Sequence, residues 1–553
     1  MSRDPFAVVQ SRDRALWVDA AADAIEARDP DDPIVIKGGV SPSGVPHIGH
    51  ANEILRGAFV AERLRDRGHE VRQVFTTDDR DRLRAVPRTL ATRDGDIVGL
   101  DAVDAGALGR NLGRPYTDVP DPFGCCDSYG AHFTHLLESI ADRLGVSIEV
   151  ISNTASYEAG DFDDAIRTVL GDLDRSRNVL ADYQDGFTES TIPFQARCES
   201  CGILTDGIES VDLDGGTVAY TCRDVDLSET TIEGCGHTGT VPFSDGKLPW
   251  RFEWPAQWAI HGVDFEPFGK DHAEGSWPSG EHIAREIFEI DPPVPMVYEW
   301  FTVDGEALSS SSGTIVTVDE VLDLLEPEVV RYFFLKDPTT QRDFSIQHLD
   351  QLVDEFDRLE AVSRGEVEAS DEEQAYAERA YPLVVDDPDA ERVRIPYTFA
   401  AVLAMTDDPD LRESIARREG HIPADASETA VEGALARVER AREWARRTDN
   451  AFNYDLKRQD CPSIEIDPGV DRALHRIAET VAEGADGERI QEVVYEAAED
   501  EAVPVQKVFE AAYRLLFDKP EGPRLGSFLA NLDRQFVVDR LRRTGENDPD
   551  RTV

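Results

Sequence analysis

The sequence predicts an α/β protein built on a parallel sheet, and two features near its N-terminus carry that prediction. The apolar run at residues 34–36 is followed by a glycine-bearing turn and then by helical spacing of apolar side chains over residues 52–67. A second apolar run at residues 71–77 ends in two acids, Asp78 and Asp79. Strand, helix and strand in this order form a βαβ unit, whose strands lie parallel. Ligands bind such sheets at the carboxyl ends of the strands, so the turn and the acids mark one candidate site.

The turn itself reads Pro-Ser-Gly-Val-Pro-His-Ile-Gly-His over residues 42–50. His47 and His50 stand three residues apart at the start of a helix, so both imidazoles can project to one side. The helix start adds unpaired N–H groups and a partial positive charge, and Gly49 leaves space for a flat ligand. Alternatively, His47 caps the helix and His50 is simply buried. The strand and glycine context favours chemistry on a nucleotide.

The rest of the chain divides by composition. Helical patterns cover residues 11–28 and 128–145, a loop rich in Gly, Pro and Asp covers 84–127, and strand-like, glycine-rich sequence covers 190–242. Beyond about residue 345 nearly all of the pattern is helical and charged. A chain of 553 residues exceeds what one core usually supports, so several domains are expected.

The charge is strongly acidic, with 111 Asp and Glu against 57 Lys and Arg and a formal net charge of −54. Only seven of the bases are lysines. The acids are spread along the whole chain, which disfavours an acidic tail and favours adaptation to concentrated salt, where charges are screened within about 3 Å at 1 M. In such salt an acidic surface does not exclude RNA as a partner. With no apolar stretch of membrane-spanning length and no signal-peptide core, we expect a cytoplasmic protein of a halophile that makes no membrane contact.

Four of the seven cysteines predict a structural zinc site in the 190–242 segment. Cys198 and Cys201 have the two-residue spacing of a zinc knuckle, and Cys222 and Cys235 follow. Three of these thiolates with His237 would also complete a tetrahedron; four unrelated core thiols are the alternative. The remaining cysteines lack such spacing and are expected to be structural: Cys125, Cys126 and Cys461.

Three further patterns have both a plain and a functional interpretation. The serines at residues 309–312 are either a flexible loop or a mobile lid whose N–H and hydroxyl groups wrap a phosphate. Residues 269–272, Gly-Lys-Asp-His, are either a polar turn or part of a site. Trp254 and Trp258, at helical spacing, are either core or the wall of a pocket for a long aliphatic cation.

Residues 47–50, His-Ile-Gly-His, are identical to the HIGH motif of class I aminoacyl-tRNA synthetases, and the loop at 307–311 occupies the place of their KMSKS motif. Further blocks resemble the class I lysyl-tRNA synthetases found mostly in archaea, and the similarity covers most of the chain. These blocks are residues 42–44, 78–79, 86–87, 117–125, 264–272 and 522–530.

The resemblance implies a Rossmann-like class I catalytic domain over residues 1–300, with a zinc-bearing insertion at 190–242. A connecting segment with the KMSKS-like loop would follow at 301–345, and an all-α anticodon-binding domain at 346–553.

The resemblance also implies that ATP activates lysine to lysyl-adenylate, which then acylates the terminal ribose of tRNA(Lys); DNA is not an expected partner. His47 and His50 would stabilise charge on the phosphates, and Gly49 would leave room for adenine. Ser43 and Gly44 would contact ATP, and Gly269, Asp271 and His272 would lie near ATP or lysine. The loop of Ser309, Ser310, Ser311 and Ser312 would close over the pyrophosphate, and Mg²⁺ would neutralise it. The expected lysine contacts are Asp78, Asp79, Tyr129, Trp254 and Trp258, with structural Zn²⁺ held by Cys198, Cys201, Cys222 and Cys235.

The sequence departs from the family pattern in the KMSKS-like loop, which contains no base. Either its N–H and hydroxyl groups suffice, or a base from elsewhere, such as Lys270, takes over part of the role. Two alternatives to a lysyl-tRNA synthetase stay open. The first is a class I synthetase for another amino acid, such as glutamate or arginine. The second is a non-catalytic, zinc-bearing, RNA-binding paralogue.

Overall fold

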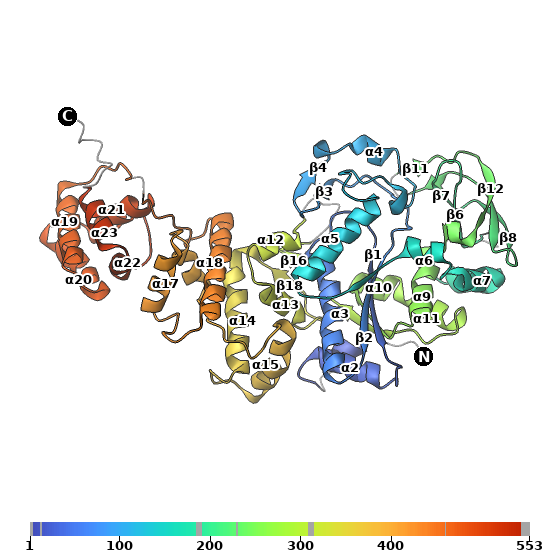
Figure 1. The fold of residues 1–553 in the computed structure, drawn as a ribbon, viewed down its shortest axis with the longest axis horizontal. Helices are drawn as coiled ribbons and strands as arrows, with labels where there is room; N and C mark the ends of the chain where they lie inside the picture. The colour runs from blue at the N-terminus through green and yellow to red at the C-terminus, as the bar shows by residue number, and fades with distance from the viewer. Residues whose placement is uncertain are drawn as a thin grey trace. The chain divides into compact units, whose positions relative to one another are not determined.

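The computed structural model describes residues 4–10, 14–183, 191–227, 230–307, 315–458 and 461–543 (Figure 1). The chain forms two compact units. The first comprises Met1–Leu322, Pro327–Ser345 and Leu359–Pro388; the second comprises Asp323–Glu326, Ile346–Arg358 and Asp389–Val553.

A five-stranded parallel sheet forms the centre of the first unit. Its strand order is β15-β14-β1-β2-β5. β1 and β2 pair residue by residue from Ile34 with Val71 to Val40 with Thr77, and α3 connects them, so the predicted βαβ unit is confirmed. The bounds are β1 (Ile34–Val40), α3 (Ile48–Asp66), β2 (Val71–Thr77), β5 (Glu149–Ser152), β14 (Phe265–Gly269) and β15 (Val294–Tyr298).

Helices cover both faces of this sheet because successive strand residues point to opposite sides. On one face α3 approaches closely at Gly57, where a Cβ would lie 3.3 Å from the Ile36 side chain; α2 (Trp17–Glu26) packs against α3. On the other face Val35 and Val74 share a buried cluster with Trp258 of α9 (Trp250–His261). Helix α11 (Trp277–Glu286) packs against α9 and completes the third layer.

The order of the strands creates a switch point beside β1. The chain passes from β1 to β2 and β5 on one side, and later to β14 and β15 on the other. The crevice outside the carboxyl ends of β1 and β14 is therefore the place where a doubly wound sheet binds its ligand.

Between β2 and β5 lies the region predicted as a loop. Its elements are short: β3 (Thr89–Ala91), β4 (Ile97–Gly99) and α4 (Ala105–Gly109). The predicted helix, α5 (Tyr129–Arg143), follows them. Between β5 and β14 three helices precede the glycine-rich segment, namely α6 (Asn153–Ala159), α7 (Asp163–Gly171) and α8 (Leu173–Ala181).

The segment predicted as strand-like is a small all-β insertion. Its three sheets are β13-β6-β7, β12-β9-β8 and β10-β11. The bounds are β6 (Gln195–Arg197), β7 (Leu204–Thr205), β8 (Ile208–Asp212), β9 (Thr217–Thr221), β10 (Val225–Asp226), β11 (Thr231–Ile232), β12 (Thr238–Pro242) and β13 (Gly246–Lys247). The insertion is too small for a core of its own and shares one with α7 and α8, through Val218, Tyr220 and Val241.

The connection after β15 contains a hairpin and a small sheet. β16 (Phe301–Val303) and β17 (Glu306–Ala307) pair antiparallel across a turn in which Asp304 and Gly305 have φ of 48° and 80°, and β18 (Arg342–Phe344) pairs with β16. The serines 309–312 lie outside the described residues. The helices that follow in this unit are α12 (Val318–Leu322), α13 (Pro327–Leu335) and α15 (Asp371–Val384), while α10 (Lys270–Gly275) lies earlier, between β14 and α11.

From Asp389 onward every described element is a helix, which confirms the predicted helical C-terminal region. Within the second unit the buried Arg437 guanidinium contacts Glu326 at 2.7 Å and Asp357 at 2.7 Å. The helices are α14 (Leu349–Ser363, which spans both units), α16 (Tyr397–Leu403), α17 (Pro409–Arg418), α18 (Glu428–Thr448), α19 (Pro468–Ala482), α20 (Gly487–Asp500), α21 (Val505–Phe517), α22 (Leu525–Asn531) and α23 (Arg534–Arg542). Among the described helices, none combines the length and apolar character needed to cross a membrane.

Candidate active site

The two histidines of the turn form a reciprocal cap on α3. His47 Nδ1 accepts a hydrogen bond from the Gly49 N–H at 3.0 Å, and His50 Nδ1 accepts one from the His47 N–H at 3.0 Å. Because both Nδ1 atoms accept, each neutral ring carries its proton on Nε2. Burial lowers the pKa of His47 to about 4 and lowers the pKa of His50 well below its usual value. Near neutral pH both rings are therefore uncharged N–H donors.

Gly49 is required by the His47 ring in this structure. A Cβ at Gly49 would lie 2.6 Å from Cε1 of His47, which no side chain tolerates. The space that the sequence suggested for a flat ligand is thus filled by His47 itself, and adenine could use it only after the ring turns away.

The flank of the KMSKS-like loop lies against this turn. The Ile48 N–H donates to the Val316 carbonyl at 3.0 Å, and Ile315 packs with Val45 and Leu136. The chain therefore leaves the serine loop directly beside the start of α3, although the two segments are more than 260 residues apart.

A cavity of about 310 Å³ opens at the switch point. It is formed by the carboxyl ends of β1, β2 and β14, by α3, and by the N-terminal part of α9. Its lining residues are Lys37, Gly39, Val40, Ser41, Glu53, Thr76, Asp78, Asp81, Arg84, Trp250, Trp254, Gln257, Glu266, Phe268 and His272.

Glu266 is held by three donors at the floor of this cavity. Its Oε1 accepts from Lys37 Nζ at 2.9 Å and from Trp254 Nε1 at 3.0 Å, and its Oε2 accepts from Trp258 Nε1. The Lys37 and Glu266 side chains are only 2% and 4% exposed. We call Glu266, Lys37, Trp254 and Trp258 the Glu266 cluster. It joins β14, β1 and α9, and it leaves Glu266 little capacity for a further cation.

A second buried ammonium comes from the insertion. Lys247 of β13 contacts the Asp81 carboxylate, and its Nζ lies 2.7 Å from Oε2 of Glu253 on α9. Tyr157 of α6 donates to the other Glu253 oxygen at 2.8 Å. Burial alone would raise the pKa of Asp81, but the Lys247 ammonium outweighs it and holds that pKa below its usual value.

Two cavity carboxyls, Asp78 and Glu53, have only neutral hydrogen-bond donors. Asp78 Oδ1 accepts from the amides of Asn153 at 2.8 Å and Gln257 at 3.4 Å. Glu53 accepts from the Gly39 N–H at 2.8 Å and from the Tyr298 hydroxyl at 3.3 Å. Burial, reinforced by Glu253, raises the pKa of Asp78 to about 8, and burial raises the pKa of Glu53 to about 7.

The structure brings some of the predicted lysine contacts to the cavity and not others. Asp78 and Trp254 line it, and Trp258 lies behind Trp254. Asp79 does not line it: its carboxylate accepts from the Ser152 hydroxyl at 2.5 Å and the Thr154 N–H at 2.8 Å, tying β2 to α6. Tyr129 belongs to a separate buried cluster with Leu83, Leu108 and Tyr116. Neither Asp79 nor Tyr129 therefore lines this cavity, and their contact with lysine stays a prediction.

Of the predicted ATP contacts, some line the cavity and others do not. His272 lines the cavity and packs on Trp250 and Trp254, with ring centroids 5.6 and 5.8 Å apart. Ser43 and Gly44 lie in the turn before His47, and Gly269 and Asp271 at the start of α10; none of these four lines the cavity. Lys270, the suggested substitute base, bonds Glu299 at 2.7 Å.

Sequence reasoning missed Lys37, Glu53 and Glu266. Lys37 carried a usable signal, since it is one of seven lysines and interrupts a strand of buried apolar residues. Glu266 lies in the family-like block at residues 264–272, but nothing singled it out there, and Glu53 carried no signal because acids are abundant throughout this chain.

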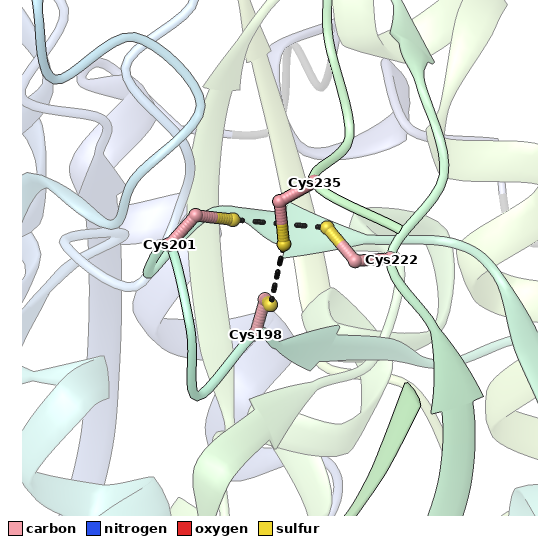
Figure 2. Close-up of side chains that lie close together, drawn as sticks. All are labelled: Cys198, Cys201, Cys222 and Cys235. Atoms are coloured by element: carbon pink, nitrogen blue, oxygen red, sulfur yellow. Dashed lines mark hydrogen bonds between the residues drawn. The ribbon is translucent and has the colours of Figure 1, made fainter. Parts of the chain in front are cut away.

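The four cysteines predicted as zinc ligands converge (Figure 2). Their sulfurs all lie within 4.8 Å of one another, with 3.6 Å between Cys198 and Cys235 and 3.7 Å between Cys201 and Cys222. His237 is outside this group, and its ring is 3.9 Å from Glu199. The donor set is therefore four thiols, which is the chemistry of a structural zinc site.

A second group of metal-binding side chains corrects the expectation that Cys125 and Cys126 lack ligand geometry. One ligand atom each from Asp121, Cys125, Cys126 and His132 lies within 4.8 Å of the others. His132 Nε2 is 2.9 Å from the Ala91 carbonyl, which leaves Nδ1 facing Cys125 Sγ at 3.3 Å. Such a carbonyl contact is the usual support for a metal-binding histidine. Cys461 belongs to neither group.

Comparison with known proteins defines the class. Residues 15–386 match the family model described as tRNA synthetases class I (K). The chain belongs to this family of aminoacyl-tRNA synthetases.

Similar relatives include lysine–tRNA ligases of halophiles. The chain is 64% identical to the lysine–tRNA ligase of Haloarcula marismortui, over 98% of this chain and 100% of that protein. It is 60% identical to the lysine–tRNA ligase of Halobacterium salinarum, over 98% of this chain and 99% of that protein. A lysine–tRNA ligase of Pyrococcus horikoshii is 30% identical over 96% of this chain and 99% of that protein.

Replacing Lys247 tests the buried ammonium. Lys247→Met leaves Asp81 and Glu253 buried without their cation, so we expect a loss of about 3–5 kcal/mol in unfolding free energy. Lys270→Met is the matched control, because the Lys270 and Glu299 side chains are 39% and 23% exposed and we expect a far smaller loss. Thermal and denaturant unfolding in concentrated salt measure both. Equal effects of the two substitutions would contradict this account of Lys247.

Proposed function

We propose that the chain is a lysine–tRNA ligase, which activates lysine with ATP to lysyl-adenylate and transfers the lysyl group to the 3′ end of tRNA(Lys). The observation that carries the proposal is the adjacency of the histidine turn and an acid-rich cavity walled by tryptophans. The near full-length similarity to lysine–tRNA ligases supports the same choice of amino acid.

The charges of the cavity favour lysine over glutamate. Glutamate would need a free basic side chain, but Lys37 is bonded to Glu266 and Arg84 lies 3.4 Å from Asp81. Lysine needs carboxylates and an apolar wall for its methylene groups. Asp78 supplies a carboxylate, and Trp254 supplies the apolar wall. Trp258 packs against Trp254 and holds it in place.

In the activation step a carboxylate oxygen of lysine attacks the α-phosphorus of ATP, and the bond to pyrophosphate breaks. The Nε2–H groups of His47 and His50, together with the N–H groups at the start of α3, would donate to the phosphoryl oxygens as charge develops. Because the rings are neutral, they act as fixed dipoles and need no proton uptake. In the transfer step the 2′-hydroxyl of the terminal ribose attacks the lysyl carbonyl, and AMP leaves.

The remaining ATP contacts would come from both sides of the turn. Ser43 and Gly44 precede His47, while Gly269, Asp271 and His272 lie across β14 and α10. Ser309, Ser310, Ser311 and Ser312 would cover the pyrophosphate, since their flank at Val316 is bonded to Ile48. Mg²⁺ would supply positive charge to the phosphates in place of the lysines that this loop lacks.

We assign anticodon binding to the helical region at residues 346–553, and the whole reaction to the cytoplasm, where tRNA is charged. The catalytic domain would span residues 1–300, with the insertion at 190–242 and the connecting segment at 301–345.

Amino-acid-dependent exchange of pyrophosphate into ATP tests the function. We expect exchange with lysine and none with glutamate or arginine. Exchange with another amino acid alone would reassign the specificity, and no exchange with any amino acid would favour the non-catalytic RNA-binding alternative.

The same exchange assay tests His47. His47→Asn keeps a side chain that caps a helix well but removes the Nε2–H donor. We expect exchange to fall by about 10²–10³-fold, as for loss of one oxyanion donor, with tRNA binding nearly unchanged. Wild-type exchange by this variant would reduce His47 to a helix cap.

We propose that the two ligand groups each hold one structural Zn²⁺. Cys198, Cys201, Cys222 and Cys235 would hold one ion in the insertion, and Asp121, Cys125, Cys126 and His132 the other. Thiolate-rich tetrahedral sets of this kind are typical of structural zinc, which contributes folding energy and leaves no position for substrate.

Metal content per chain tests both sites. We expect two zinc ions in the wild type and one fewer in each of Cys201→Ser and Cys126→Ser. Cys461→Ser is the matched control, because it removes the remaining cysteine without touching either group, and it should retain both ions. A wild-type content of one would disprove one site, and the two variants identify which.

A further inference from the structure

The cavity is surrounded by more buried acidic side chains than basic ones. Lys37 bonds Glu266, and Lys247 bonds both Asp81 and Glu253. Both resident ammonium groups are thereby occupied, and two further carboxyls of the cavity, Asp78 and Glu53, have no basic group within 4 Å in the described part of the chain. The serine loop outside that part contains no base.

Asp78 faces charged groups from three directions. The insertion presents Lys247, α9 presents Glu253, and β1 presents Lys37, while Asp81 follows on the same segment. Its hydrogen bonds come from the neutral amides of Asn153 and Gln257, and both end on Oδ1. Tyr116 is the remaining titratable neighbour. Among the described residues none donates a hydrogen bond to Oδ2 of Asp78, and Asp78 lines the cavity.

Glu53, which lines the same cavity from α3, has a similar environment. Glu266 of β14 and Lys37 of β1 are its charged neighbours, and the Tyr298 hydroxyl of β15 is its titratable one. It lies on α3 one turn beyond His50, on the nucleotide side of the proposed site. The other charged lining groups are engaged elsewhere: Arg84 contacts Asp81, and the His272 ring packs on tryptophans.

We propose that Asp78 and Glu53 each receive one of the two ammonium groups of free lysine, and that both carboxyls are left ionised by its binding. The inference deepens the proposed function and rests on it. Lysine is the common amino acid with an α-ammonium and a second ammonium at the end of an aliphatic chain. Trp254 lies in the same cavity and gives that chain an apolar wall.

Binding then releases protons. In the empty cavity burial holds the pKa of Asp78 at about 8 and that of Glu53 at about 7. Near pH 7, therefore, Asp78 is mostly protonated and Glu53 is about half protonated. The incoming ammonium groups keep their protons, and the carboxyl protons pass to the buffer. Each proton released makes the dissociation constant of lysine about tenfold larger per unit fall in pH. Affinity therefore falls from about pH 8 towards pH 6, where both carboxyls are protonated before lysine arrives.

Calorimetric titration of the full chain with lysine tests this directly. Measured in two buffers of different ionisation enthalpy, the heat gives the number of protons released. We expect between one and two protons released near pH 7. At about pH 9 we expect no net release, because both carboxyls are already ionised and part of the free lysine must take up a proton at its α-amine to bind as an ammonium. No release near pH 7 would overturn the proposal.

Isosteric variants assign the release to the two carboxyls. Asp78→Asn and Glu53→Gln should each release fewer protons and bind lysine at least tenfold more weakly. Glu274→Gln, which removes an exposed acid of α10 outside the cavity, is the matched control and should match the wild type. Wild-type proton release in both carboxyl variants would also overturn the proposal.

Two analogues of lysine separate the partners. Norleucine lacks the terminal ammonium, and 6-aminohexanoate lacks the α-ammonium. Each analogue should be insensitive to one of the two substitutions and sensitive to the other. If Mg²⁺ alone releases the same protons and competes with lysine, the carboxyls form a metal site and the proposal is wrong. Lysine-dependent exchange without proton release would refute the inference while leaving the proposed function intact.

Discussion

The burial of Glu266 is the constraint on which the site depends. A carboxylate with 4% exposure would be costly to bury without partners, and here one ammonium and two indole N–H groups satisfy it. Because Lys37 comes from β1, Glu266 from β14 and the indoles from α9, the same contacts fix the switch point of the sheet and the tryptophan wall. The shape of the cavity follows from this one cluster.

The use of lysine in the chain is consistent with that constraint. Among 57 basic residues only seven are lysines, and Lys37 and Lys247 are both buried at the site. A compact ammonium fits between carboxylates in a small space, whereas a guanidinium needs room for a planar fork. Surface pairs such as Arg489–Glu496 are screened in concentrated salt, but buried pairs are screened much less. A protein with a net charge of −54 can therefore still contain a precise arrangement of charges at its site.

The sequence predicted the parts of the fold that depend on local pattern. The βαβ unit, the histidine turn, the cysteine-bearing β insertion and the helical C-terminal region all follow from periodicity or short spacing. The Glu266 cluster could not be predicted, because Lys37 and Glu266 are 229 residues apart and neither has a local motif. The position of Tyr129 outside the cavity could not be predicted, because it depends on packing with Tyr116 in a separate buried cluster. The group around Cys125 was missed because its ligands span a loop and the first turns of α5, with a spacing unlike a zinc knuckle.

The central claim is that lysine lies in the cavity at the switch point, above Glu266 and against Trp254. A crystal structure of the full chain with lysine bound tests this claim most directly. The account predicts one ammonium group within hydrogen-bonding distance of Asp78, the other within the same reach of Glu53, and the Lys37–Glu266 pair intact. Lysine bound outside this cavity, or an ammonium group that displaces Lys37 from Glu266, would contradict it.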